Sequence, residues 1–186
     1  IIGEKDACGV GFIANIKGIE SNWILKQSLK GLNCMEHRGG CGGDSDSGDG
    51  AGILCSIPWG YLEEEMNLKN TKELNRGLGM VFMPNKKEKI EECKSICEEE
   101  AEKLRVKDTS WRTVPVNNEI LGPLAKANVP YICQWILYIN TKDNQNIEKL
   151  LFQLRKRIEK KIRDTFKIDV GDCEFYFASL SSQTVV

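Results

Sequence analysis

The chain has 186 residues, 41% of them hydrophobic, with 26 basic and 27 acidic residues and a formal net charge of -1. This length suits one domain with a substantial core, and the near-neutral charge gives no electrostatic reason to expect nucleic acid or an anionic membrane as a partner. No apolar run approaches the roughly 20 residues that a membrane-spanning helix needs, and the short, charged start of the chain does not resemble a signal peptide. Because the first residue is not Met, we expect the chain to begin after processing or at a fragment boundary.

Residues 8 to 59 are predicted to form short elements on either side of a glycine-rich loop. Apolar residues recur at every second position at the start of this stretch and at helical spacing further on, which are the periods of strands and helices. In chain order we expect a strand over 8–16, a helix from Ser21 or Asn22 to about His37, a tight loop over 39–52, a strand over 51–57 and a short helical turn at Pro58-Trp59.

The remaining residues are predicted to form helices packed on a sheet. Two of the helices carry long apolar stripes with charged residues opposite. The predicted elements are a strand over 76–83, a helix over 86–104, a strand over 110–116 closed by Pro115, a short helix over 121–127, a strand over 131–139, a helix over 146–166, a strand over 173–180 and the start of another at 183–186. This mixture indicates an α+β fold of stacked layers. Since the chain ends inside the last strand and leaves its edge unpaired, we expect the fold to be incomplete at the C-terminus.

The eight cysteines are expected to be reduced. An even number is compatible with disulfides, but the chain is large and shows no secretory signal, which favours free thiols in an intracellular compartment. Cys93 and Cys97 are one helical turn apart and could share a face. His37 is the sole histidine and no CxxC is present, so we expect no zinc site. The cysteines also do not resemble the ligand set of an iron–sulfur cluster.

Three aspartates in the glycine-rich loop, Asp44, Asp46 and Asp49, raise the question of a calcium site. A helix–loop–helix calcium site would place Gly at the sixth position of the loop, where this chain has Asp49, and Glu at the twelfth, where it has Cys55. We therefore expect no metal here. The pattern instead predicts a turn network, in which Asp and Ser side chains accept hydrogen bonds from backbone amides while glycines adopt positive φ.

Cys8 is the candidate nucleophile. A cysteine is most often a small buried core residue, but Gly9 and Gly11 follow Cys8 in a predicted strand, where glycine is disfavoured unless a molecule approaches the backbone closely. If trimming made Cys8 the first residue, its α-amine, with an ordinary pKa of about 7.7–8.0, could act as general base for its own thiol. Arg38, at the end of a predicted helix, is either a solvated or ion-paired side chain or lies near Cys8, where it would lower the pKa of the thiol.

From Cys8 onward the sequence resembles the class II glutamine amidotransferase domain of glutamate synthases. The resemblance covers essentially the whole chain in order, and around Trp111 to Val116 it is closest to the ferredoxin-dependent enzymes of plastids and cyanobacteria. The stretches that carry it are Asp6-Ala7-Cys8-Gly9-Val10-Gly11-Phe12, Cys34-Met35-Glu36-His37-Arg38-Gly39-Gly40, Asp46-Ser47-Gly48-Asp49-Gly50-Ala51-Gly52, Ile57-Pro58-Trp59, Gly77-Leu78-Gly79-Met80-Val81-Phe82, Trp111-Arg112-Thr113-Val114-Pro115-Val116 and Phe175-Tyr176-Phe177-Ala178-Ser179-Leu180-Ser181-Ser182.

This resemblance implies an N-terminal nucleophile hydrolase fold, a four-layer α/β/β/α sandwich that is incomplete here at the C-terminus. Residues 1–7 would be a propeptide or leader, and residues 8–186 the N-terminal portion of the amidotransferase domain. Cys8 would attack the side-chain amide of L-glutamine, releasing ammonia and forming a thioester that water converts to glutamate. Arg38 would be catalytic and would bind the substrate together with Gly39.

For the whole enzyme, the resemblance implies that ammonia passes to 2-oxoglutarate within the remainder of the glutamate synthase chain. It implies no cofactor in this segment, FMN and an iron–sulfur cluster elsewhere, ferredoxin as a partner, and a plastid stroma or a cyanobacterial cytoplasm as the location. Residues 1–7 still block the amine of Cys8. The family's oxyanion-hole Asn-Gly and glutamine-binding Arg and Asp have no counterpart up to Val186, so this chain alone is expected to be inactive.

Three alternatives stay open on the sequence. The segment could belong to an NADPH-dependent glutamate synthase. It could be a non-catalytic structural segment of the same fold. It could also be a metal-binding module built on the aspartate loop or on the cysteines.

Overall fold

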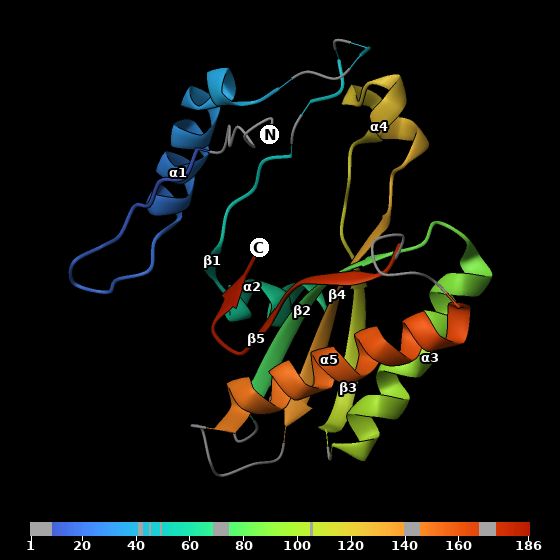
Figure 1. The fold of residues 1–186 in the computed structure, drawn as a ribbon. Helices are drawn as coiled ribbons and strands as arrows, with labels where there is room; N and C mark the ends of the chain where they lie inside the picture. Colours follow the sequence, from blue (N-terminus) through green and yellow to red (C-terminus); the bar gives the residue numbers. More distant parts are fainter. Residues whose placement is uncertain are drawn as a thin grey trace, which may run out of the picture. The chain divides into compact units, whose positions relative to one another are not determined.

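The computed structural model describes residues 9–40, 43–44, 46–48, 50–68, 75–104, 106–139, 146–167 and 174–186, and of Arg38 the backbone alone. The chain divides into two compact units. The N-terminal unit comprises residues 1–55 and 117–129, and the sheet unit comprises residues 56–116 and 130–186. Figure 1 labels the helices α1 to α5 and the strands β1 to β5.

The sheet unit is built on a four-stranded antiparallel sheet with the strand order β3-β4-β2-β5. Its strands are β2 (Asn75–Met83), β3 (Val106–Thr113), β4 (Tyr131–Ile139) and β5 (Tyr176–Ser181). β2 and β4 pair along their whole length, whereas the pairing of β2 with β5 shifts between Met80 and Val81. Because β2 and β4 each have a neighbour on both sides, their backbone groups are satisfied within the sheet. The side chains of β4 are largely apolar because both of its faces are buried, as Ile136 and Leu137 show.

Two long helices, α3 (Lys87–Lys103) and α5 (Ile147–Phe166), cover one face of this sheet (Figure 1). Every second side chain of the central strands points toward them, because side chains alternate between the two faces of a strand. The buried residues on this face are Val81, Met83, Cys93, Ile96, Cys97, Ala101, Val106, Cys133, Trp135, Leu137, Ile139, Ile147, Leu151, Leu154, Ile158, Ile162, Phe175 and Phe177. Full burial of one Leu or Ile side chain contributes roughly 1.5–3 kcal/mol, so this layer is the main source of the unit's stability.

β2 carries two glycines where other elements approach its backbone closely. A β-carbon on Gly77 would lie 3.0 Å from Leu151 Cδ2, and one on Gly79 would lie 3.2 Å from Leu180 Cδ1 and 3.3 Å from Phe177 Cε1. These separations are shorter than ordinary van der Waals contacts, so a β-carbon at either position would require the neighbouring core side chain to shift by a few tenths of an ångström. The two glycines therefore allow α5 and β5 to pack directly on the strand.

The helix α2 (Trp59–Glu65) is tied to the opposite face of the sheet. Trp111 packs against the core on the α3 and α5 side, so the next residue of β3, Arg112, points the other way. Its Nε donates to Glu65 Oε2 at 3.0 Å, and its Nη1 donates to Gln134 Oε1 at 3.0 Å. The guanidinium thus joins α2 to two strands, and most of it is shielded from water, since the side chain is 11% exposed.

The N-terminal unit combines an early and a later part of the chain. Its helices are α1 (Asn22–Cys34), the 3-10 helix η1 (Glu36–Arg38), the 3-10 helix η2 (Asn118–Ile120) and α4 (Pro123–Ala127). Ser21 caps α1 by accepting a hydrogen bond from the N–H of Ile24 at 3.4 Å. No residue of α1 is buried, so its apolar stripe does not face a core in the part of the chain that the structure describes.

The strand predicted over residues 8–16 is wrong for its described part. Residues 9–16 form no strand, and Val10 and Phe12 are each 94% exposed. Alternating apolar residues produce a strand only where a second segment satisfies the backbone N–H and C=O groups. Among the described residues no segment pairs with residues 9–16, and Cys8 itself lies outside them.

Other predicted elements differ at their ends. β1 (Cys55–Ser56) and β6 (Thr184–Val185) pair with each other and are shorter than the strands predicted over 51–57 and 183–186. The strand predicted over 110–116 is β3. It begins earlier than predicted, at Val106, because its pairing with β4 continues to Ile139. It ends at Thr113, before Pro115, which has no N–H to donate. The short helix predicted over 121–127 is α4, which begins at its proline, a favoured first helical residue.

The predicted α+β class is confirmed. β4 has the predicted bounds, and α3, α5 and β2 agree with prediction to within a residue at each end. The strand predicted over 173–180 is β5, although Cys173 lies outside the described residues. A sheet with a helical layer on one face is compatible with one α/β half of a four-layer sandwich. In the ranges described above, no helix combines the length and the apolar character needed to cross a bilayer.

Candidate functional site

The predicted site residues belong to the N-terminal unit. Cys8 lies outside the described residues. Arg38 is the last residue of η1, and its side chain also lies outside the description. Gly39 follows in an extended conformation, with φ -87° and ψ 151°, and its N–H donates to Glu36 O at 3.0 Å. The catalytic role of Cys8 and the substrate-binding roles of Arg38 and Gly39 therefore stay predictions.

The end of α1 determines where the chain reaches Arg38. The N–H of Met35 donates to Leu32 O at 3.0 Å, and His37 Nδ1 donates to Cys34 O at 3.0 Å. These bonds satisfy carbonyl groups that a helix end leaves without partners. The predicted helix therefore ends at Cys34, three residues before the predicted end near His37, and a separate turn of 3-10 helix leads to the exposed Gly39.

The glycine-rich loop folds back on the segment that contains Gly39. Gly48 lies against Gly40, since a β-carbon on Gly48 would come within 3.2 Å of Gly40 O. A β-carbon on Gly39 would lie 3.4 Å from Glu36 O. Gly39, Gly43, Gly48 and Gly50 do not adopt positive φ, which corrects the prediction that they would. At Gly48 the absence of a side chain serves close backbone packing rather than a left-handed conformation.

The predicted network of Asp and Ser side chains is present at Asp44 and Ser47. Asp44 Oδ1 accepts a hydrogen bond from the Ser47 N–H at 2.8 Å, and Oδ2 accepts one from Ser47 Oγ at 2.7 Å. Oδ2 also accepts a hydrogen bond from the N–H of Leu124 at 2.9 Å. This last bond, supported by those from Ser47, lowers the pKa of Asp44 to about 2 because each donor favours the ionised carboxylate.

No pattern in the sequence indicates that the network of Asp44 and Ser47 binds the start of α4. The Leu124 N–H belongs to the first turn of α4, and the next N–H of that turn, on Ala125, donates to Ser47 Oγ at 3.0 Å. The first N–H groups of a helix have no partner within it, and here two side chains of the loop supply the acceptors. Leu124 lies 80 residues after Asp44, and Ala125 lies 78 residues after Ser47. Only folding brings these residues together.

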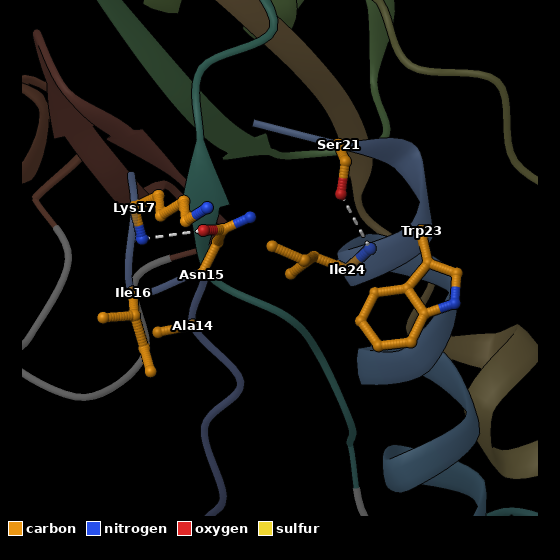
Figure 2. Close-up of a pocket in the computed structure, with 7 residues that line it drawn as sticks. All are labelled: Ala14, Asn15, Ile16, Lys17, Ser21, Trp23 and Ile24. Carbon is orange, nitrogen blue, oxygen red and sulfur yellow. Dashed lines mark hydrogen bonds between the residues drawn. The ribbon is translucent and has the colours of Figure 1, made fainter. Parts of the chain in front are cut away.

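An open groove of about 420 Å³ lies beside the start of α1 (Figure 2). Its lining consists of Ala14, Asn15, Ile16, Lys17, Ser21, Trp23 and Ile24. Lys17 is the single ionisable side chain in this lining, and none of the predicted site residues belongs to it. Asn15 and Ser21 are engaged locally, with Lys17 and Ile24 as the donors. The groove therefore offers mainly apolar surface and no thiol.

The described cysteines that lie in the core are not suited to act as nucleophiles. Cys34, Cys55, Cys93, Cys97 and Cys133 are free thiols, as predicted. Burial raises the pKa of Cys97, with further increases from the neighbouring Cys93 and Cys133. Burial also raises the pKa of Cys133 to about 12. A reactive cysteine needs an accessible thiolate, so these core thiols are structural. Within the described ranges, no three His, Cys, Asp or Glu residues are arranged to hold a metal ion.

The stretch from Trp111 to Val116 has a packing role. The Trp111 ring stacks on Trp135 with the ring centroids 5.1 Å apart, while Arg112 joins α2 to the sheet from the opposite face. This stretch therefore supports the sheet unit.

Comparison with known proteins identifies the class to which this fold and these motifs belong. Residues 8–186 match the family of class-II glutamine amidotransferases, so the chain is a member of that family. Among its curated relatives are the chloroplastic/mitochondrial ferredoxin-dependent glutamate synthase 1 of Arabidopsis thaliana, 42% identical over 100% of this chain, and the ferredoxin-dependent glutamate synthase 2 of Synechocystis, 37% identical over 100%. The glutamate synthase [NADPH] large chain of Bacillus subtilis is 40% identical over 98% of this chain. The chain spans 12% of the length of each of these relatives.

Proposed function

We propose that the chain is the glutaminase segment of a glutamate synthase, and that Cys8 is its nucleophile. The observation that carries this proposal is the family match, which covers residues 8–186 and so begins at Cys8 itself. A match that begins at a cysteine supports a mature domain in which Cys8 is the first residue. Residues 1–7 would then be a propeptide or leader that is removed.

In the proposed reaction, the Cys8 sulfur bonds to the side-chain amide carbon of L-glutamine. The free α-amine of Cys8 takes the thiol proton and passes it to the departing nitrogen, which leaves as ammonia. Water then attacks the γ-glutamyl thioester, restores the thiol and releases glutamate. Arg38 and Gly39 bind the substrate, and the positive charge of Arg38 favours the thiolate. While residues 1–7 remain attached, the nitrogen of Cys8 is an amide and cannot accept a proton.

The proposed whole enzyme uses the released ammonia to aminate 2-oxoglutarate in the remainder of the chain. Ferredoxin is the proposed electron donor because ferredoxin-dependent enzymes are prominent among the relatives. FMN and an iron–sulfur cluster would supply the redox chemistry of such an enzyme. Among the described residues no three His, Cys, Asp or Glu side chains are arranged to hold a metal ion, and we assign both groups to the remainder of the proposed enzyme. The chloroplastic relative suggests a plastid location, and the relative from Synechocystis a cytoplasmic one.

The experiment that tests the nucleophile is peptide mass spectrometry of the natural full-length protein after treatment with an electrophilic glutamine analogue. We expect the mature chain to begin at Cys8 and to carry the adduct there. Cys8→Ala should abolish glutaminase activity, whereas Cys34→Ala, which removes an exposed thiol, should leave labelling at Cys8 intact. A mature chain that keeps residues 1–7 and leaves Cys8 unlabelled would favour the non-catalytic structural alternative.

The 186 residues by themselves are expected to hydrolyse no glutamine, because they contain no counterpart of the family's oxyanion-hole Asn-Gly or of its glutamine-binding Arg and Asp. Removing one oxyanion donor alone costs about 10²–10³ in rate. Glutamine turnover by the isolated chain that disappears in Cys8→Ala would refute this expectation.

NADPH is the second candidate electron donor, since the Bacillus subtilis relative carries that name. The two donors are distinguished by measuring glutamate formation from glutamine and 2-oxoglutarate with reduced ferredoxin or with NADPH. Activity with NADPH alone would assign the chain to the NADPH-dependent class without changing the role of Cys8.

A further inference from the structure

The segment that carries the proposed substrate-binding residues is linked to α4 by a short series of contacts within the N-terminal unit. Gly39 and Gly40 follow η1 directly. Gly48 packs on Gly40 O, because a β-carbon on Gly48 would lie 3.2 Å from that oxygen, closer than an ordinary van der Waals contact. Ser47, next to Gly48, accepts a hydrogen bond from α4. The position of Gly40 therefore depends on Gly48, and the residue before Gly48, Ser47, is hydrogen-bonded to α4.

Asp44 and Ser47 make this attachment with four hydrogen bonds. Two of them join Asp44 to Ser47 and fix the turn between these residues, at 2.8 and 2.7 Å. In the other two, Asp44 Oδ2 accepts a hydrogen bond from the Leu124 N–H at 2.9 Å, and Ser47 Oγ accepts one from the Ala125 N–H at 3.0 Å. Each bond to the carboxylate is charge-assisted and therefore stronger than a bond between neutral groups.

Gly122 shows how closely the loop approaches α4. A β-carbon on Gly122 would lie 2.6 Å from Ser47 Oγ, 2.7 Å from Ser47 N and 2.8 Å from Asp46 C. Two of these three atoms are backbone atoms, so no rotamer change could relieve the overlap. Gly122 keeps an ordinary negative φ of -65°, and the absence of a side chain is needed here for space alone.

We infer that Asp44 and Ser47 are positioning residues for glutamine binding, and that they hold the segment Arg38–Gly40 in place by anchoring its loop to α4. This inference rests on the proposed function. It also assigns a role to residues 117–129, because they contain α4, to which the loop with Asp44 and Ser47 is hydrogen-bonded. Neither Asp44 nor Ser47 takes part in bond breaking; both act through the backbone of Gly48 and Gly40.

The test compares variants of the natural full-length protein by the rate at which two reagents modify Cys8. An electrophilic glutamine analogue needs the contacts of the substrate-binding segment, whereas iodoacetamide makes none of those contacts and responds to the segment only through the effect of the Arg38 charge on the thiolate. In Ser47→Ala and Gly122→Ala we expect the rate with the analogue to fall about tenfold or more, because a displacement of 1 Å can cost roughly 10²-fold. The rate with iodoacetamide should fall by a clearly smaller factor than the rate with the analogue, because it loses only the effect of the Arg38 charge on the thiolate. The KM for glutamine should rise more than kcat falls.

Two further variants separate positioning from general damage. Ser47→Thr keeps the hydroxyl acceptor and should recover most of the labelling rate with the analogue. Gly43→Ala is the matched control for Gly122→Ala, because Gly43 belongs to the same loop and a β-carbon there has no atom within 4 Å. It should label at the wild-type rate with both reagents.

The outcomes distinguish the two proposals. If the analogue does not label Cys8 in the wild-type protein, the proposed function fails and this inference fails with it. If the wild-type protein is labelled and Ser47→Ala and Gly122→Ala are labelled at the same rate, the inference alone is overturned. A parallel loss with both reagents in both variants would also overturn it, because it would show a general structural role.

Discussion

Glu100 of α3 is the buried charged residue in the described part of the chain, with 5% of its surface exposed. Its carboxylate accepts hydrogen bonds from Arg157 Nε of α5 at 2.8 Å and from Lys103 Nζ at 2.6 Å, and Lys161 Nζ lies 3.7 Å away. The bond from Lys103, followed by that from Arg157, lowers the pKa of Glu100 against the opposing effect of burial. Glu100→Gln would keep the shape of the side chain and remove its charge.

The expected cost of Glu100→Gln follows from the exposure of the partners. A hydrogen bond to a charged group contributes about 1.5–3 kcal/mol, but the Arg157 and Lys103 side chains are 48% and 50% exposed and regain water when the carboxylate is lost. Screening by solvent reduces such pairs toward 1 kcal/mol or less each. We therefore expect a loss of about 1–2 kcal/mol, which corresponds to roughly 5–30-fold in the opening equilibrium.

Hydrogen exchange of the α3 and α5 amides in the full-length protein measures this opening directly. At pH 7 the two helices of Glu100→Gln should exchange about 5–30-fold faster than those of the wild type. Because the folded-state pKa of Glu100 is lowered, its contribution is complete above the unfolded pKa of about 4.3 and is lost as the pH falls through the folded pKa. The difference should therefore narrow as the pH approaches 3.

The control for this prediction is Glu102→Gln, which removes an exposed carboxylate from the same helix and should leave exchange unchanged. Equal exchange in Glu100→Gln and wild type at pH 7 would show that the ion pairs do not hold α3 against α5. A difference that stayed constant between pH 7 and pH 3 would refute the electrostatic explanation and assign the effect to packing.

Two further predictions concern the core of the sheet unit. Gly79→Ala places a β-carbon 3.2 Å from Leu180 Cδ1, so it should destabilise the sheet by about 1–3 kcal/mol and accelerate exchange in β2 and β5. Gly60→Ala has no atom within 4 Å of the new β-carbon and should not. Alkylation of the native protein near pH 7 should modify the exposed Cys34 and spare the buried Cys133, whose pKa of about 12 keeps it protonated. Modification of both thiols at equal rates before unfolding would contradict the described core.

The elements that sequence reasoning located best are those whose hydrophobic period is long and regular. The apolar stripe of α5 repeats over five turns and contains Leu151, Leu154 and Ile158, all fully buried. The bounds of β4 agree with prediction because its run from Tyr131 to Ile139 is nearly continuous in apolar residues, as expected for a strand that is buried on both faces. In both cases the local pattern and the tertiary packing require the same residues, so the pattern alone was sufficient.

The predictions that failed depend on a partner that the local sequence does not reveal. Val10 and Phe12 alternate as in a strand, yet a strand needs a second strand, and its presence is decided elsewhere in the chain. Conversely, the network of Asp44 and Ser47 was predicted as a local turn, and its attachment to Leu124 was missed because the pairing spans 80 residues. The roles of Cys8 and Arg38 came from family resemblance together with the chemistry of an amino-terminal thiol, and no described contact tests them.

The motifs that identify the family do physically different work, and this affects how loss of activity is to be interpreted. Trp111 stacks on Trp135. Gly79 leaves space for Phe177 to pack on β2, and Ser47 anchors a loop to α4. A substitution at Trp111 or Gly79 would reduce activity by destabilising the sheet unit, and would do so equally for every reagent that reaches Cys8. A substitution at Ser47 should instead discriminate between a reagent that resembles glutamine and one that does not. Activity alone therefore cannot distinguish support from substrate binding in this family, whereas the ratio of the two labelling rates can.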